Sequence, residues 1–399
     1  MFTHNNYINR LEAKDFVFSD FPQKKSMKDY EIVYSKIKNI CSKHKEILSV
    51  YTFGEIKAPG ISDIDLIFVL RRGAKLPGFL KKLTLDKDSK YVLLHPFFIV
   101  PADFMENISY IHPNSDYKLI YGQKIKVKEL SKQDVLKVYQ YLVSDVILRH
   151  FPSDYLNVLL SGKINVRLAL VRLNALHHSF SLFKSVSGKS KKEWKSISDD
   201  IYALRKDWFN VTNEIAKRKI LHLLKTALYV SLDFVEEHRK FMEARIKNLN
   251  GREIVFKGIQ NRISFARNWN PQDALSQMIN HYSRHKNFYS VLPKVFIYHL
   301  HAYASGKGPL SSYIYKRLSS RLDIQVNHVL MKRVHLSNYQ VEYAMNLKHS
   351  HFPCFFPLGF KSTKGLKNKM IYVYVKITDH SLFKKGMHFI RSRLRFIPV

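Results

Sequence analysis

The chain has 399 residues, enough for two or three domains that each bury a core of their own. Hydrophobic residues make up 46% of the sequence, which excludes a tail-rich or low-complexity protein. The two cysteines, Cys41 and Cys354, follow neither a disulfide nor a metal-ligand spacing, so we expect a reducing, cytoplasmic environment. The N-terminus lacks the apolar segment of a signal peptide. The apolar stretch Phe288–Ser305 is interrupted and too short for a bilayer span, so it predicts a buried helix and no transmembrane segment.

Charge is the most unusual bulk property of the chain. Lys and Arg number 66 and Asp and Glu number 32, a net charge of +34. Such an excess favours an anionic partner, and RNA or another polyanion, peripheral contact with an acidic membrane, and phosphorylated small molecules all fit. Compositional bias is the alternative explanation, although it accounts for abundant Lys better than for scarce Asp and Glu.

A short N-terminal extension, residues 1–26, precedes an expected mixed α/β unit at 27–130 with a small mixed sheet. Apolar residues at three- and four-residue steps predict a helix over Met27–Glu46, followed by a strand over Ile47–Phe53 that stops at Gly54. A loop then leads into a second predicted strand, Asp63–Leu70. A third strand is predicted over Tyr91–Val100, at an edge or with a bulge because it contains a proline.

From Ser131 onward the pattern becomes helical, with Ser131 as a predicted N-cap. The resulting bundle, residues 131–250, contains further helical patterns at about 164–182, 196–209 and 211–247. Residues 251–399 form a basic, mainly helical region with an unassigned fold. It has helix-like stretches at 271–285 and 292–304, a strand-like run at 371–377, and an Arg-rich end.

Two aspartates carry the clearest chemical signal. Asp63 and Asp65 are two residues apart on a predicted strand, so their side chains point to the same side with backbones about 6.6 to 6.8 Å apart. Their carboxylates can therefore converge on a metal ion. Mg²⁺ is typically held by one or two carboxylates together with substrate phosphates and water.

The segment Phe53–Leu66, FGEIKAPGISDIDL, resembles the signature of the nucleotidyltransferase superfamily that includes DNA polymerase β. That signature is a strand, a Gly-Ser or Gly-Gly turn opening a helix, a short loop and a Ser-Asp-x-Asp strand. The resemblance implies that Asp63 and Asp65 bind Mg²⁺ or Mn²⁺ as the catalytic residues. It also implies that a nucleoside triphosphate such as ATP contacts the segment from Gly54 to Ser62, with Gly54 at the turn.

The chain departs from this pattern at Glu55, which stands where the family has Ser or Gly. A carboxylate facing the triphosphate would repel it unless Lys57 compensates, whereas a carboxylate in the first turn of a helix would only stabilise that helix. We slightly favour the helix-start interpretation. Glu55, Lys57 and Ser62 accordingly complete the predicted nucleotide-binding set.

The family also places a third carboxylate on a later strand. The strand predicted over Tyr91–Val100 contains no acid, and the candidates just outside it are Asp103, after the strand, and Asp86 and Asp88, before it. We take Asp103 as the candidate third acid.

Three functions remain open. The first is an enzyme that transfers a nucleoside monophosphate from a triphosphate to an unidentified acceptor, using a divalent metal. The second is a catalytically degenerate relative that binds nucleotide or RNA without turnover. The third is a basic RNA- or membrane-binding protein, which would show strongly salt-dependent binding without any need for a triphosphate.

Overall fold

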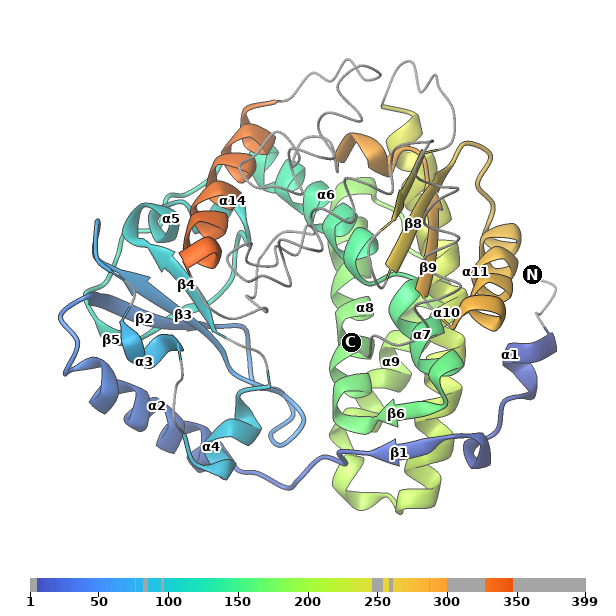
Figure 1. Cartoon of the computed structure of the whole chain (residues 1–399), viewed down its shortest axis with the longest axis horizontal. Coiled ribbons are helices and arrows are strands. Elements are labelled where there is room, and N and C mark those ends of the chain that lie inside the picture. The colour runs from blue at the N-terminus through green and yellow to red at the C-terminus, as the bar shows by residue number, and fades with distance from the viewer. Residues whose placement is uncertain are drawn as a thin grey trace, which may run out of the picture.

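The structure is a computed structural model that describes residues 6–75, 77–81, 85–94, 97–245, 254–257, 261–286, 288–299 and 327–346. An α/β unit and a helical bundle lie side by side in it (Figure 1). The strand-like run expected at 371–377 and the Arg-rich end lie outside the described residues. The predicted mixed α/β class with a small mixed sheet is confirmed. None of the described helices is both long and apolar enough to cross a bilayer.

The α/β unit begins with helix α2, Met27–Cys41, as the sequence predicts. Ser26 caps it, because its backbone N–H donates to the Asp29 carboxylate at 2.7 Å and Asp29 lies in the first turn. Buried residues of α2 recur on one side, from Tyr30 through Val33 and Ile37 to Cys41. This side packs against one face of the sheet.

The sheet has four strands in the order β4-β3-β2-β5. Strand β2, Ile47–Phe53, is the predicted strand, and it pairs antiparallel with both β3, Asp65–Leu70, and β5, Tyr117–Gly122. Strand β4, Phe98–Pro101, lies parallel to β3. Two short helices, α3 (Gly78–Lys81) and α4 (Lys87–Val92), lie between β3 and β4, and α5 (Ala102–Glu106) follows β4.

The prediction of a strand over Tyr91–Val100 was wrong at its N-terminal end. Tyr91 and Val92 belong to helix α4, which begins at an N-cap, Asp86, whose carboxylate accepts a hydrogen bond from the Ser89 amide at 3.0 Å. The strand therefore starts only at Phe98. A capping aspartate outweighed the β-forming character of the residues that follow it.

Alternation along β3 divides the core into two layers. Leu66, Phe68 and Leu70 pack on the side of α2, whereas Ile67 and Val69 belong to the larger core that continues into the helical bundle. One face of the sheet is therefore turned toward the bundle.

The bundle is formed by long helices whose starts carry the expected signals. Ser131 caps α6, Lys132–Arg149, by accepting a hydrogen bond from the Asp134 amide at 3.2 Å, as predicted. Four helices follow it: α7 (Ser153–Ser161), α8 (Val166–Ser187), α9 (Lys192–Lys206) and α10 (Asn213–Glu243).

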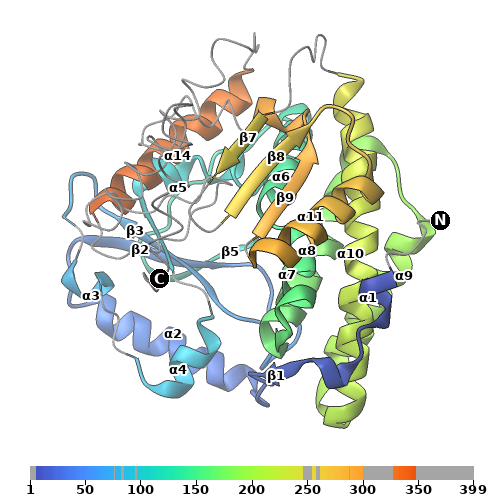
Figure 2. The same ribbon diagram turned by 45° about the vertical axis from the view of Figure 1, so that its right-hand side comes forward.

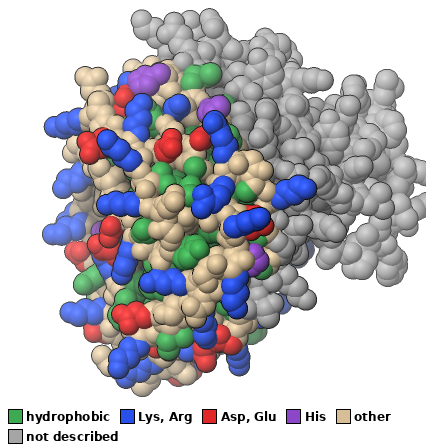
Figure 3. Space-filling view, turned by 90° about the vertical axis from the view of Figure 1, so that its left-hand side faces the viewer, with side chains coloured by type: hydrophobic (Ala, Val, Ile, Leu, Met, Phe, Trp, Pro, Cys, Tyr) green, Lys and Arg blue, Asp and Glu red, His purple; other side chains and the backbone are tan. Residues whose placement is uncertain are grey.

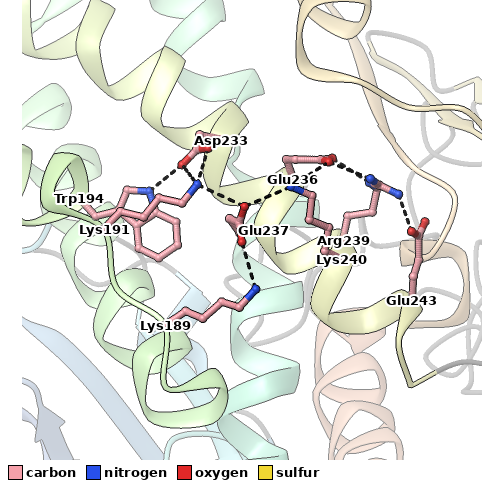
Figure 4. Close-up of polar contacts among 9 residues, drawn as sticks. All are labelled: Lys189, Lys191, Trp194, Asp233, Glu236, Glu237, Arg239, Lys240 and Glu243. Atoms are coloured by element: carbon pink, nitrogen blue, oxygen red, sulfur yellow. Dashed lines mark hydrogen bonds and ion pairs between the residues drawn. The ribbon is translucent and has the colours of Figure 1, made fainter. Parts of the chain in front are cut away.

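Charged side chains join the start of α9 to α10 (Figure 4). Lys191 contacts Asp233 at 2.7 Å, and the Trp194 indole N–H donates to the same carboxylate at 3.0 Å. Lys189 reaches Glu237 at 3.4 Å. Because these acids are already paired with bases and an indole, the cluster serves packing within the bundle.

The N-terminal segment runs along the bundle. After α1, Asn6–Arg10, strand β1, Val17–Ser19, pairs in parallel with β6, Lys163–Asn165. The Lys225 ammonium of α10 donates to the Asn9 carbonyl at 3.0 Å. These contacts tie residues 6–19 to the bundle before the chain enters α2.

A three-stranded sheet packs beside the bundle (Figure 2). It consists of β7 (Ile254–Lys257), β8 (Asn261–Ala266) and β9 (Phe288–Pro293), with α11 (Pro271–His285) against β9. The helix at 271–285 is therefore confirmed. The helix expected from 288 onward was wrong over 288–293, because a short apolar run fits a buried strand as well as a helix.

Helix α14, His328–Asn346, returns to the α/β unit and lies next to β4 and α6. The fully buried Arg333 guanidinium donates to the Asp145 carboxylate of α6 at 2.5 Å, and the His299 ring contacts the other oxygen of that carboxylate. Burial acts to raise the pKa of Asp145, but Arg333 and His299 hold it below its usual value. This group fixes the later part of the chain on α6.

Figure 3 shows the face formed by the α/β unit. Lys and Arg side chains are spread over this face with Asp and Glu side chains among them. On this face, the positive charge does not form a single continuous patch. The polyanion partner expected from the net charge stays a prediction.

Candidate functional site

The carboxylate pair lies where β3 begins. Asp65 is the first residue of β3 and stands opposite Phe53, the last residue of β2. Asp63 lies two residues earlier, in the loop, although we expected both on the strand. By alternation, Asp65 shares its side of β3 with Ile67 and Val69, so it faces the bundle.

The two carboxylates affect each other's ionisation. Burial, together with the nearby negative charge of Asp63, raises the pKa of Asp65 to about 7. At neutral pH the site is therefore poised between holding a proton and holding two negative charges. A divalent cation would stabilise the doubly charged form.

The two carboxylates fit a Mg²⁺ ion whose other ligands come from a substrate and water. Two carboxylates at one strand start match the usual protein share of a Mg²⁺ site, in which phosphates and water supply the other ligands. Among the described residues, no cluster of three or more His, Cys, Asp or Glu could hold a metal ion. The site therefore lacks the ligands of a closed, all-protein metal site within the described part of the chain.

The loop before the pair contains no helix. Gly54 has φ +79°, a conformation that favours glycine, and the chain from 54 to 64 continues in bends and turns. The expected helix start at Glu55 is therefore wrong. Glu55 is exposed and forms an ion pair at 2.9 Å with Lys57, two residues later, so its charge is compensated locally.

Two tyrosines hold the turn at Gly60, where the φ of +84° and the contact with the carbonyl of Gln23 leave no room for a side chain. The Tyr30 hydroxyl accepts a hydrogen bond from the Gly60 amide at 2.9 Å and donates to the Ser62 carbonyl at 2.7 Å. The Tyr91 hydroxyl donates to the Gly60 carbonyl at 2.5 Å. Helices α2 and α4 thereby fix the chain just before the carboxylate pair.

Arg167 of α8 binds the same loop from the bundle. Its guanidinium donates to the carbonyls of Ile61 and Ser62, each at 3.2 Å, and also to the carbonyl of Tyr91. It lies 4.0 Å from the Tyr91 ring centroid. Because Arg167 is almost fully buried, these carbonyls replace water as its partners.

Ser62 has a structural role in this arrangement. Its buried hydroxyl accepts hydrogen bonds from the Ala58 amide at 3.3 Å and from the Arg205 guanidinium at 3.2 Å. Arg205, from α9, also donates to the Leu170 carbonyl at 2.9 Å. The hydroxyl that we expected to contact nucleotide instead joins the loop to the bundle.

Arg205 is also the cation next to Asp63. Burial lowers the pKa of Arg205, and the negative charge of Asp63 acts in the opposite direction. Sequence reasoning missed both Arg167 and Arg205. The available signal was that each is a charged residue among the buried, apolar positions of its helix, such as Ile201 and Leu204 around Arg205.

The structure does not bring Asp103 to the carboxylate pair. Strand β4 runs parallel to β3 with Pro101 opposite Leu70, and Asp103 follows Pro101. Leu70 is at the other end of β3 from Asp65, about 16 Å away at the usual rise per residue. Asp103 instead pairs with Arg72 at 3.1 Å.

Asp86 and Asp88 are also engaged elsewhere, in ion pairs with Lys36 at 2.7 Å and Lys25 at 2.9 Å. Two surface pockets lie where the N-terminal segment meets α7 and α10, and neither is lined by Asp63 or Asp65. The candidate site therefore consists of Asp63 and Asp65 with the loop and the arginines that hold it.

Comparison with known proteins gave no match: no family model, curated protein or solved structure is significantly similar to this chain.

Proposed function

We propose that the chain is a nucleotidyltransferase, which transfers a nucleoside monophosphate from a triphosphate to an acceptor. The observation that carries the proposal is the carboxylate pair where β3 begins: Asp65 faces the bundle, and burial together with the charge of Asp63 raises its pKa. The order of elements supports it, because a helix, a strand ending at a glycine turn, and the carboxylate strand follow one another as in the superfamily that the sequence resembles, although no helix follows the glycine turn at 54–64.

Each part of the site has a role in this reaction. Asp63 and Asp65 would hold a divalent cation, which would neutralise charge that develops on the reacting phosphate. Gly54 leaves the end of β2 free of a side chain, so the backbone can lie close to the triphosphate. The acceptor oxygen forms a bond to the α-phosphorus as the bond to the pyrophosphate breaks, and the acceptor loses its proton.

A degenerate nucleotide-binding protein is the second candidate. Two observations favour it: the described part of the chain brings no third carboxylate to the pair, and Arg205 lies near Asp63. A protein of this kind would bind nucleotide with metal and release no pyrophosphate. Turnover therefore separates the two candidates.

The test incubates the full chain with each α-labelled triphosphate and Mg²⁺ or Mn²⁺, and follows label into protein, RNA and small-molecule fractions. We expect transfer that falls to background in Asp63→Ala and in Asp65→Ala. Asp103→Ala is the matched control, an acid from the same sheet whose loss should leave transfer unchanged. Equal metal-dependent nucleotide binding in the wild type and both site variants would refute the assignment. Binding without transfer would support the degenerate candidate.

A further inference from the structure

Helix α8 presents a polar face toward the loop that precedes the carboxylates. Arg167, Asn174 and His178 are spaced by seven and four residues, so they lie on the same side of the helix. Arg167 shows where this side points, because it binds the carbonyls of Ile61 and Ser62. Asn174 and His178 continue this face along α8, the helix that stands opposite the α/β unit in Figure 1.

His178 has neighbours from three elements. On α8 itself, Asn174 Nδ2 lies 3.1 Å from His178 Nε2, and the ring of His177 lies next to it. Lys57, in the loop after β2, and Arg205, on α9, act on the ring through their charge. The His178 side chain is solvent-exposed, yet the surrounding protein lowers its pKa, and the positive charges of His177, Lys57 and Arg205 lower it further.

The permanent cations around the loop already have partners, and the buried Arg167 is bonded to backbone carbonyls. Lys57 is paired with Glu55 at 2.9 Å, and Arg205 lies beside Asp63 with its N–H groups bonded to Leu170 and Ser62. A triphosphate would add several negative charges to this site even when a divalent cation accompanies it. A neutral histidine within reach of Lys57 can supply further positive charge by taking up a proton.

We propose, resting on the proposed function, that His178 binds the phosphate chain of the nucleoside triphosphate as an imidazolium, opposite Lys57. In the neutral ring Nε2 accepts from Asn174 Nδ2, so on protonation the Asn174 amide must turn its oxygen toward Nε2–H, which leaves Nδ1–H for a phosphate oxygen. Nucleotide binding then takes up a proton, and the histidine contributes a charge-assisted hydrogen bond only in the bound state. Its contribution grows as the pH falls and vanishes in alkaline solution.

The experiment measures binding of α,β-methylene-ATP with saturating Mg²⁺ by calorimetry at pH 6 and pH 8. Each variant is compared with the wild type at the same pH, so that protonation of Asp65 cancels. We expect His178→Gln to bind about tenfold more weakly than the wild type at pH 6 and equally at pH 8. His178→Lys, which carries a permanent charge, should bind tightly at both. The same titration in buffers of different ionisation enthalpy should show that His178→Gln takes up one proton fewer than the wild type on binding the nucleotide.

His177→Gln is the matched control, because the neighbouring side chain lies about 100° around the helix from His178. It should bind no more weakly than the wild type at either pH, because loss of the His177 charge can only favour protonation of His178. Equal affinities of His178→Gln and the wild type at pH 6, or an equal loss in His177→Gln, would overturn the proposal. If Asp63→Ala abolishes binding while His178→Gln binds as tightly as the wild type at pH 6, the phosphate-binding role fails and the proposed function stands. If the wild type shows no Mg²⁺-dependent binding, both fail.

Discussion

Replacing Asp65 with Asn should stabilise the protein in alkaline solution and have little effect in acid. The substitution keeps the size of the side chain and removes the charge that burial and Asp63 disfavour. A pKa raised in the folded state favours the protonated carboxyl. The stability that this protonation contributes is full below pH 4 and is lost as the pH rises through about 7. Asn imitates the protonated form at every pH.

The size of the effect follows from the pKa. A rise from 3.8 to about 7 corresponds to at most about 4 kcal/mol, at about 1.4 kcal/mol for each pKa unit. Asp65 keeps partial contact with solvent, which reduces the cost of its charge. We therefore expect Asp65→Asn to exceed the wild type in unfolding free energy by roughly 1 to 3 kcal/mol at pH 8. Near pH 4 the two should be equal.

Urea denaturation at pH 4, 5, 6, 7 and 8, with chelator present, measures this difference. Asp103→Asn is the control, since its carboxylate is in a surface ion pair, and its effect should not grow between pH 6 and 8. Added Mg²⁺ should narrow the difference between the wild type and Asp65→Asn, because only the wild type retains both metal-binding carboxylates. A difference that stays constant from pH 4 to pH 8, or a variant less stable than the wild type at pH 8, would refute the reasoning.

Three further changes test the loop and the charged surface. Arg167→Met should lower the unfolding free energy by about 3 kcal/mol in a urea titration, because three backbone carbonyls lose their buried donor. Glu55→Ser should change stability by less than about 0.5 kcal/mol and tighten Mg²⁺-dependent nucleotide binding severalfold, since it removes an exposed negative charge. Unchanged affinity would contradict a triphosphate near this loop. Lys219→Ala, on α10, should elute from heparin at lower salt than the wild type and than Lys124→Ala, in the α/β unit, if polyanions bind the helical region. Identical elution would contradict this.

Features encoded within a few residues could be predicted from the sequence. The capped start of α6 at Ser131, strand β2 and helix α11 all follow local rules of capping and periodicity, and the structure has them where the sequence places them. The start of β4 and strand β9 could not be predicted in the same way. At each position the residues fit both a helix and a strand. Capping by Asp86 started a helix before β4, and pairing with β8 made 288–293 a strand.

The carboxylate pair could likewise be predicted from local sequence, whereas the residues around it could not. Asp63 and Asp65 are two residues apart, so their spacing alone predicts that they can act together. Asp103 could be judged only after the parallel register of β4 on β3 was known. Arg205 reaches Ser62 across more than a hundred residues of sequence, and no local pattern indicates such a contact.

These long-range contacts bear on function because the carboxylate pair is costly to keep. Burial and mutual repulsion disfavour the charge on Asp65, and a core optimised for stability alone would replace it with a neutral residue. The chain instead commits Arg167 and Arg205, both buried, together with Tyr30 to holding the turn that leads into the pair. A site that is costly in free energy and held by side chains of both the α/β unit and the bundle is typical of one that binds a ligand. A divalent cation supplies the positive charge that would offset this cost, and a triphosphate supplies further oxygen ligands to that cation. The same energetics therefore support the proposed function and predict that both ligands together raise the thermal stability of the wild type and leave Asp65→Asn unchanged.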